Sequence, residues 1–402
     1  EPKPRSAFYR INIAEQRDSL EADVKRVNAE RSVTAGEALR IQESYKEAIA
    51  KYQEAYQLYQ DVGDTAGAAL ALLDIGKANY FLLDMHEAIA SYEKALKLFE
   101  ADNIRLDQGV SLLYIGMAKL FLGLNNDALS YYDRALHLFN NENDQRYYSF
   151  ALNEIGRAYY LQGDANTALN YYNQALPIRQ ELNDRKGESF TLVSIGRVYS
   201  NVFGSDTLAR DYYQRALALQ REIGNRRLIA QTLGDIGRLS YRAGEYTAAL
   251  NTYTEALRTA GDGDPSVRAE ILMYIGLVYS AWGRHREAID HYFNDALRLQ
   301  EDRDARGFAR TRQQIGRSYA ALGEDDKALE HLKAALKLWQ NVVHRTAEAE
   351  TRYHIALIES KKGHLAEACE QIKTALPAVE SLRSGIWNRA LRANYFASVQ
   401  NY

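Results

Sequence analysis

The stretch SFALNEIGRAYYLQGDANTALNYYNQAL, residues 149–176, decides the fold. Its apolar residues recur at helical spacing from Phe150 to Tyr159, and the polar tripeptide at 162–164 interrupts them. A second helical pattern then runs from Ala168 to Leu176. The stretch therefore predicts a helix, a tight turn and a second helix.

This unit recurs along the sequence at an almost fixed period. The dipeptide Ile-Gly occurs seven times, and its glycines are Gly76, Gly116, Gly156, Gly196, Gly237, Gly276 and Gly316. Successive glycines are separated by 40, 40, 40, 41, 39 and 40 residues. A period in this range is typical of a solenoid, in which stacked helix pairs form one long surface.

Two further positions follow the glycine at fixed distances. Twelve residues on there is usually an alanine, and four later usually an aromatic residue, as in Tyr92, Tyr132, Tyr172, Tyr253 and Tyr292. Glycine inside a helix costs about 1 kcal/mol relative to alanine. Its sevenfold retention predicts that the backbone of another helix passes where a methyl group would lie.

The pattern Leu152-x2-Ile155-Gly156-x2-Tyr159, followed by Ala168-x3-Tyr172, resembles the tetratricopeptide repeat (TPR). That repeat normally has a 34-residue period, so the chain is similar to the long-period type found in kinesin light chains and Gα-binding polarity adaptors. Degenerate copies around Gly36 and Ala356 bring the expected number to about nine. The resemblance implies an all-α, right-handed superhelical solenoid of antiparallel helix pairs. We expect it to span residues 29–380, after a lead segment at 1–28 and before a helical connector or cap at 381–402.

The period slips at three places. Residues 201–206 contain one extra residue and predict a lengthened turn, and Pro265 is suited to the first turn of a helix. One extra residue also lies between Tyr292 and Ala296, which predicts a π-bulge or kink at residues 293–295. Neutral drift in a tolerant array explains these slips more simply than a designed change of curvature.

Composition excludes several function classes. A net charge of −3 argues against general nucleic-acid binding, which needs a basic surface. There is no long apolar run that predicts a membrane span. The single cysteine, Cys369, cannot form an internal disulfide and is expected to be a small buried residue. We find no metal-ligand spacing, phosphate-binding loop or catalytic constellation, so we expect a cytoplasmic, non-enzymatic protein without cofactors.

The TPR resemblance implies that the first helix of each pair lines the concave groove. The residue after the repeat glycine is basic in five units: Lys77, Arg157, Arg197, Arg238 and Arg317. Neighbours on the same helical face add Asn153, Gln313, Tyr80, Tyr160 and Tyr241. Because arginine binds carboxylates in bidentate fashion, this stripe predicts a groove for an acidic or extended peptide or for the C-terminus of a partner protein.

The alternative is that these cations pair within their own helices. Asp74 and Lys77 are three residues apart, as are Glu154 with Arg157 and Asp235 with Arg238. Arg197 and Arg317 have no carboxylate three residues earlier, so they are the strongest candidates for ligand contact.

The segment at residues 379–400 breaks the repeat. Leu391-Arg392, Tyr395-Phe396 and Ser398-Val399-Gln400 resemble the connector that follows the TPR array in bacterial proteins with a caspase-like CHAT protease domain. The resemblance implies a protein- or peptide-binding scaffold that serves as the recognition or regulatory arm of such a protein. Two alternatives are a receptor for a signalling peptide or small ligand that changes conformation, and a self-associating structural scaffold.

Overall fold

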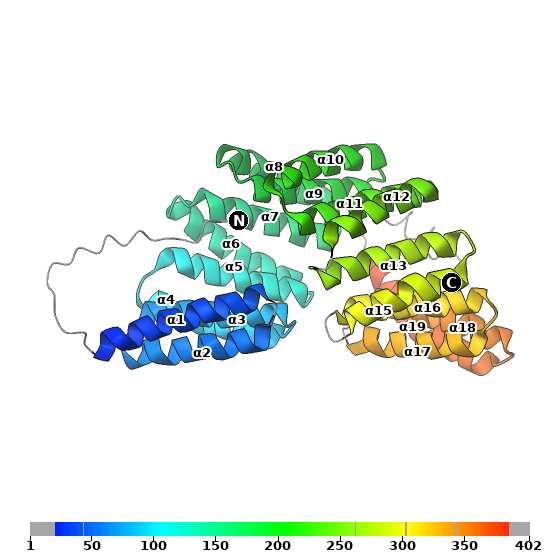
Figure 1. Cartoon of the computed structure of the whole chain (residues 1–402), viewed down its shortest axis with the longest axis horizontal. Helices are drawn as coiled ribbons and strands as arrows, with labels where there is room; N and C mark the ends of the chain where they lie inside the picture. The colour runs from blue at the N-terminus through cyan, green and yellow to red at the C-terminus, as the bar shows by residue number, and fades with distance from the viewer. Residues whose placement is uncertain (1–20, 43, 262, 302–303, 342–343, 386–402) are drawn as a thin grey trace. The chain divides into compact units, whose positions relative to one another are not determined.

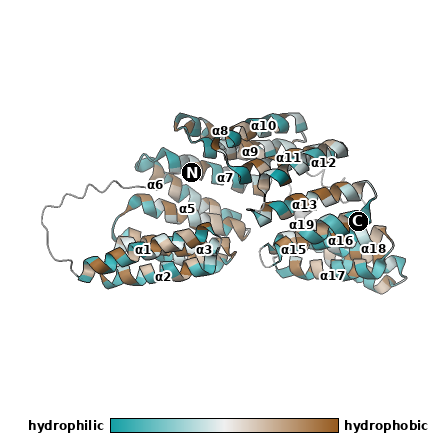
Figure 2. Ribbon diagram, in the orientation of Figure 1, coloured by the Kyte–Doolittle hydropathy of each residue, from teal (hydrophilic) through white to brown (hydrophobic). Residues whose placement is uncertain are grey.

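The computed structural model describes residues 21–42, 44–261, 263–301, 304–341 and 344–385. Within these ranges every regular element is a helix, and the helices form nine successive antiparallel pairs (Figure 1). Figure 2 shows apolar and polar residues alternating along each helix, as expected for helices with one buried face. The all-α solenoid of helix pairs predicted from the sequence is confirmed.

The protein divides into two compact units, Glu1–Glu154 and Ile155–Tyr402. The first unit holds three helix pairs and the start of α7 (Gln145–Gln162). The pairs are α1 (Glu21–Ile41) with α2 (Tyr45–Asp61), α3 (Thr65–Phe81) with α4 (Met85–Ala101), and α5 (Arg105–Phe121) with α6 (Asn125–Asn141).

The second unit continues the same pattern from the end of α7. Its helices are α8 (Ala165–Glu181), α9 (Arg185–Asn201), α10 (Asp206–Ile223), α11 (Arg226–Arg242), α12 (Tyr246–Ala260), α13 (Pro265–Ala281), α14 (His285–Glu287), η1 (Ala288–Phe293), α15 (Asn294–Gln300), α16 (Ala305–Ala321), α17 (Asp325–Asn341), α18 (Arg345–Lys361) and α19 (Leu365–Gly385). The elements α14, η1 and α15 together form the second helix of one pair. Helix α1 begins before residue 29, and residues 386–402 of the expected connector lie outside the described ranges.

The repeat glycines make room for an aromatic ring. A Cβ atom on Gly76 would lie 2.4 Å from Cε1 of Tyr92, and one on Gly116 would lie 2.5 Å from Cε1 of Tyr132. The expectation that a helix backbone fills this place was therefore wrong for most repeats. The fully buried ring from the second helix lies across the glycine, so the ring occupies the space of the missing methyl group.

Short turns with capped helix starts set the length of each unit. Helices α2 and α3 are separated by three residues, and the last of these, Asp64, accepts a hydrogen bond from the backbone N–H of Gly67 at 2.8 Å. The turn between α9 and α10 has four residues, which confirms the predicted lengthening. Pro265 begins α13, as expected, and Asp264 caps that helix.

The predicted π-bulge is present, but it begins earlier than expected. The π-helical segment η1 covers Ala288–Phe293 rather than residues 293–295. As a result Phe293, and not Tyr292, is the ring against Gly276, where a Cβ atom would lie 2.4 Å from Phe293 Cε1. The extra residue is accommodated before the buried ring because the ring must face the glycine.

Two other expectations concern single features. Cys369 is exposed, so its predicted burial was wrong. It lies on α19, the last helix of the described residues, where no further helix pair covers the outer face. Within the described ranges, no helix combines the length and apolar character needed to cross a membrane.

Candidate functional site

The basic column lies on the first helices of the pairs, and in the first unit it is neutralised locally. Lys77 on α3 forms an ion pair with Asp74 at 2.9 Å, which confirms the alternative of pairing within one helix. Tyr80, one turn further on, packs edge-on against Phe121 of the next pair, with ring centroids 6.2 Å apart. This part of the stripe is therefore held by neighbouring side chains.

In the second unit, two arginines of the column meet at one carboxylate. Arg197 on α9 donates to Oδ2 of Asp235 from Nε at 3.0 Å and from Nη2 at 2.9 Å. Arg238 on α11 donates from Nη2 to Oδ1 of the same residue at 2.6 Å. The interpretation that Arg197 lacks a carboxylate partner was wrong, because its partner comes from the next helix pair and is not visible in local spacing.

The electrostatics of this cluster follow from the buried carboxylate. The negative charge of Asp235, whose side chain is 6% exposed, raises the pKa of Arg197. Burial lowers the pKa of Arg238, but the charge of Asp235 raises it by more, so the net shift is upward. Burial and the nearby charge of Glu270 raise the pKa of Tyr274. Tyr274 therefore keeps its proton and donates it to Oε1 of Glu270 at 3.2 Å.

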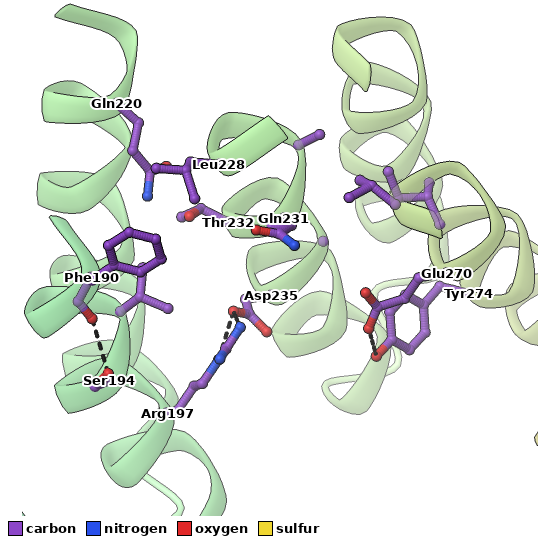
Figure 3. Close-up of a pocket in the computed structure, with 15 residues that line it drawn as sticks. Phe190, Ser194, Arg197, Gln220, Leu228, Gln231, Thr232, Asp235, Glu270 and Tyr274 are labelled. Atoms are coloured by element: carbon purple, nitrogen blue, oxygen red, sulfur yellow. Dashed lines mark hydrogen bonds and ion pairs between the residues drawn. The ribbon is translucent and has the colours of Figure 1, made fainter. Parts of the chain in front are cut away.

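A cavity of about 290 Å³ opens beside this cluster, between the first helices of three successive pairs (Figure 3). Arg197 and Asp235 lie at one end of it, and Glu270 and Tyr274 lie on the α13 side. Its lining comprises Phe190, Val193, Ser194 and Arg197 of α9, Gln220 of α10, Leu228, Ala230, Gln231, Thr232, Gly234 and Asp235 of α11, and Val267, Glu270, Ile271 and Tyr274 of α13. Of the residues predicted from the sequence, only Arg197 lines this cavity.

The other predicted residues are distributed along both units. Arg317 on α16 lies 3.6 Å from Glu350 of α18, so it too has a partner from the next pair. Tyr160 accepts a hydrogen bond from Nδ2 of Asn201 at 2.8 Å. Tyr241 on α11 packs against another tyrosine, and Arg157 on α7 is half-buried.

Two predicted residues point into the core. Gln313 is buried and accepts a hydrogen bond from Nε1 of Trp339 at 3.1 Å. Asn153 is also buried. Both lie three residues before the repeat glycine, and this position faces the neighbouring helix. Local sequence reasoning also missed Gln220, Gly234 and Tyr274, although a second glycine inside α11 was a visible signal.

Among the residues that the structure describes, no group of His, Cys, Asp and Glu side chains could hold a metal ion. The cavity instead offers apolar walls with charged and amide groups at its ends. Such an arrangement is typical of binding sites in which a few polar groups orient an apolar ligand.

Comparison with known proteins places this architecture. A tetratricopeptide repeat family model matches residues 30–101, 107–181 and 188–262, and a second TPR model matches residues 235–304. The protein belongs to the tetratricopeptide repeat family. A model of the C-terminal domain of suppressor of spindle checkpoint defect 1 also matches residues 275–394. No curated protein sequence matches this one.

Several solved structures share the fold at low sequence identity. A Rap protein complexed with competence and sporulation factor is 15% identical with a TM-score of 0.61, over 90% of this chain and 99% of that one. The Rap conjugation gene regulator of plasmid pLS20, in complex with the Phr* peptide, is 18% identical with a TM-score of 0.57, over 89% and 96%. A STAND protein from Pyrococcus horikoshii with a TPR sensor is 16% identical with a TM-score of 0.58, over 85% of this chain and 53% of its own.

Proposed function

We propose that this TPR scaffold binds an extended peptide segment of a partner along the first helices of the second unit. The observation that carries the proposal is the cavity between α9, α11 and α13, with the half-exposed Arg197 at its edge. The guanidinium of Arg197 holds Asp235, and 47% of its side chain remains exposed, so it can also bind a ligand carboxylate or carbonyl. The fold supports this role, since a Rap regulator of similar fold binds the Phr* peptide.

Peptide selection tests the proposal. A random peptide library would be panned on the folded protein, and the affinities of selected peptides measured by calorimetry. We expect Arg197→Gln to weaken binding about tenfold, the loss of one hydrogen bond to a charged group. Arg215→Gln is the matched control, because Arg215 is similarly exposed on α10 and lies outside the cavity. Equal affinities for the two variants would reject this site.

A second reading is a receptor for a small ligand. The volume of about 290 Å³ is near the lower end of small-molecule sites, which start at about 300 Å³. Panning would then yield no peptides, whereas a metabolite library screened by thermal shift would yield a stabilising ligand. Limited proteolysis with and without that ligand would show whether it changes conformation.

The finer proposal is that the scaffold is the recognition or regulatory arm of a larger protein with a caspase-like protease domain. It rests on the resemblance of residues 379–400, most of which lie outside the described ranges. The coding sequence beyond Tyr402 tests it first, since a protease domain must follow. If one does, its activity should change when a selected peptide is added and should not change in the Arg197→Gln variant.

A further inference from the structure

One glycine in the cavity wall has no packing explanation. Gly234 lies in the middle of α11, and a Cβ atom there would meet no atom within 4 Å. Three residues later, a Cβ atom on Gly237 would lie 2.5 Å from Cε1 of Tyr253. Glycine is unfavourable relative to alanine inside a helix. The ring of Tyr253 accounts for Gly237, but nothing in the described structure accounts for Gly234.

Other repeats fill the equivalent position with a side chain. The residue three before the repeat glycine is Leu73, Leu113, Asn153, Val193, Met273 or Gln313 in the units from Gly76 to Gly316, and each of these is buried. Gly234 therefore removes one buried side chain from the contact between adjacent pairs. The cavity is lined by Gly234 and by Val193, the equivalent residue of the preceding unit.

A buried amide without a partner lines the same cavity. Gln220 is 1% exposed, and its Oε1 accepts no hydrogen bond. Two pairs further along the sequence, Thr311 Oγ1 donates to Oε1 of the equivalent Gln300 at 2.8 Å. Thr232 holds the place of Thr311 here, yet Gln220 receives no such bond. A buried acceptor without a donor carries an unrecovered desolvation cost, so its retention points to a donor on a ligand.

The size and walls of the cavity define that ligand. An apolar cavity of about 150 Å³ binds benzene, so a volume of about 290 Å³ admits a larger aromatic group. Val193, Leu228, Val267 and Ile271 supply apolar walls. Figure 3 shows Gln220, Leu228 and Thr232 together at one end. An aromatic group with a hydrogen-bond donor at its far end matches both the walls and the unpaired acceptor.

We propose that the Gly234 cavity is a socket for the side chain of a tyrosine or tryptophan in the bound peptide, whose O–H or N–H donates to Oε1 of Gln220. The inference rests on the peptide-binding function proposed above and names the residue type that anchors the peptide. The protein uses the same chemistry internally, since Trp339 Nε1 donates to Oε1 of Gln313 with both residues buried. Buried tyrosine and tryptophan side chains usually require such an acceptor.

Fragment binding tests the socket independently of any peptide. p-Cresol and toluene have the same ring and methyl group, but only p-cresol carries a donor. Methyl resonances of Val193, Leu228 and Ile271 would be followed by NMR as each compound is added to the full-length protein. We expect p-cresol to shift all three and to bind about tenfold more tightly than toluene, as one hydrogen bond to a buried acceptor predicts.

Two variants and a control decide the outcome. Gly234→Leu, which places the residue of Leu73 and Leu113 in the socket, should abolish the shifts. Gln220→Met, which keeps length and removes the acceptor, should abolish the preference for p-cresol. Met273→Leu, at the equivalent position of α13 and outside the cavity, should change neither.

The possible failures are distinguishable. No shift with either compound, or shifts that survive Gly234→Leu, would overturn the socket. Equal binding of both compounds to the wild type would overturn the role of Gln220 and hence the assigned residue type. Selected peptides that bind wild type and Gly234→Leu equally would overturn the socket and leave the peptide-binding function standing. A functioning socket with no selectable peptide would instead reject the proposed function.

Discussion

Two glycines on one helix should respond in opposite ways to the same substitution. Gly234→Ala adds a methyl group to open space and gains helix propensity, so we expect stabilisation by about 0.5–1 kcal/mol. Gly237→Ala gains the same propensity but places Cβ 2.5 Å from a carbon of Tyr253, whereas carbon atoms normally approach to about 3.5–4.0 Å. Tyr253 is fully buried and cannot retreat. Overpacking costs about 1–3 kcal/mol, so we expect net destabilisation of about 1–2 kcal/mol.

Native-state hydrogen exchange of peptides from α11 measures the difference locally, which matters because a repeat array need not unfold in one step. The two variants should differ by about 2–3 kcal/mol, or roughly 30- to 150-fold in the opening equilibrium of this helix. Gly276→Ala, which faces Phe293, is the control and should behave like Gly237→Ala. If both α11 variants move protection in the same direction, the claim that Gly234 borders empty space is refuted.

Three further substitutions test the packing and electrostatics. Asp235→Asn removes the buried charge that holds two arginines and should destabilise the second unit by about 2–4 kcal/mol in urea unfolding; an unchanged midpoint would show that the arginines do not need it. Tyr253→Phe removes a buried hydroxyl that has no partner and should cost less than about 0.5 kcal/mol by the same assay, as Phe293 at the equivalent position suggests; a larger loss would reveal a hidden partner. Burial lowers the pKa of His344 below its ordinary value of about 6.5, so the unfolded state binds the proton first and the start of α18, which His344 caps, should lose up to about 1 kcal/mol as pH falls below 6.5. His344→Asp should abolish this pH dependence of α18 exchange, and its persistence would place the titration elsewhere.

The sequence determines the fold through features that act over short distances. The Ile-Gly dipeptide, the alanine at twelve residues and the following aromatic all report contacts inside one helix pair, so their spacing predicts the pair directly. Spacing misplaces the π-helix because it shows that one residue is extra but not which buried ring must keep its place. That choice depends on Phe293 facing Gly276, a contact between two helices.

The site was less predictable because its contacts join different pairs. Asp235 lies 38 residues from Arg197, and no local rule links them. Gln313 and Asn153 share a helical face with exposed cations, which predicts surface positions for both. That face is partly covered by the next pair, so both side chains are buried. The glycine at 234 could be seen in the sequence, but its meaning required knowledge of what surrounds it.

The π-helical segment η1 has a consequence for how such an array changes over evolutionary time. An inserted codon in a compact globular domain usually shifts everything downstream of it. Here Ala288–Phe293 absorbs one surplus residue within a single helix, and the next glycine, Gly316, again follows at the normal interval. Each pair thus restores the phase of the repeat by itself. Single-residue insertions and deletions in one pair should therefore be inherited without repair elsewhere, so individual units can diversify their surfaces one at a time.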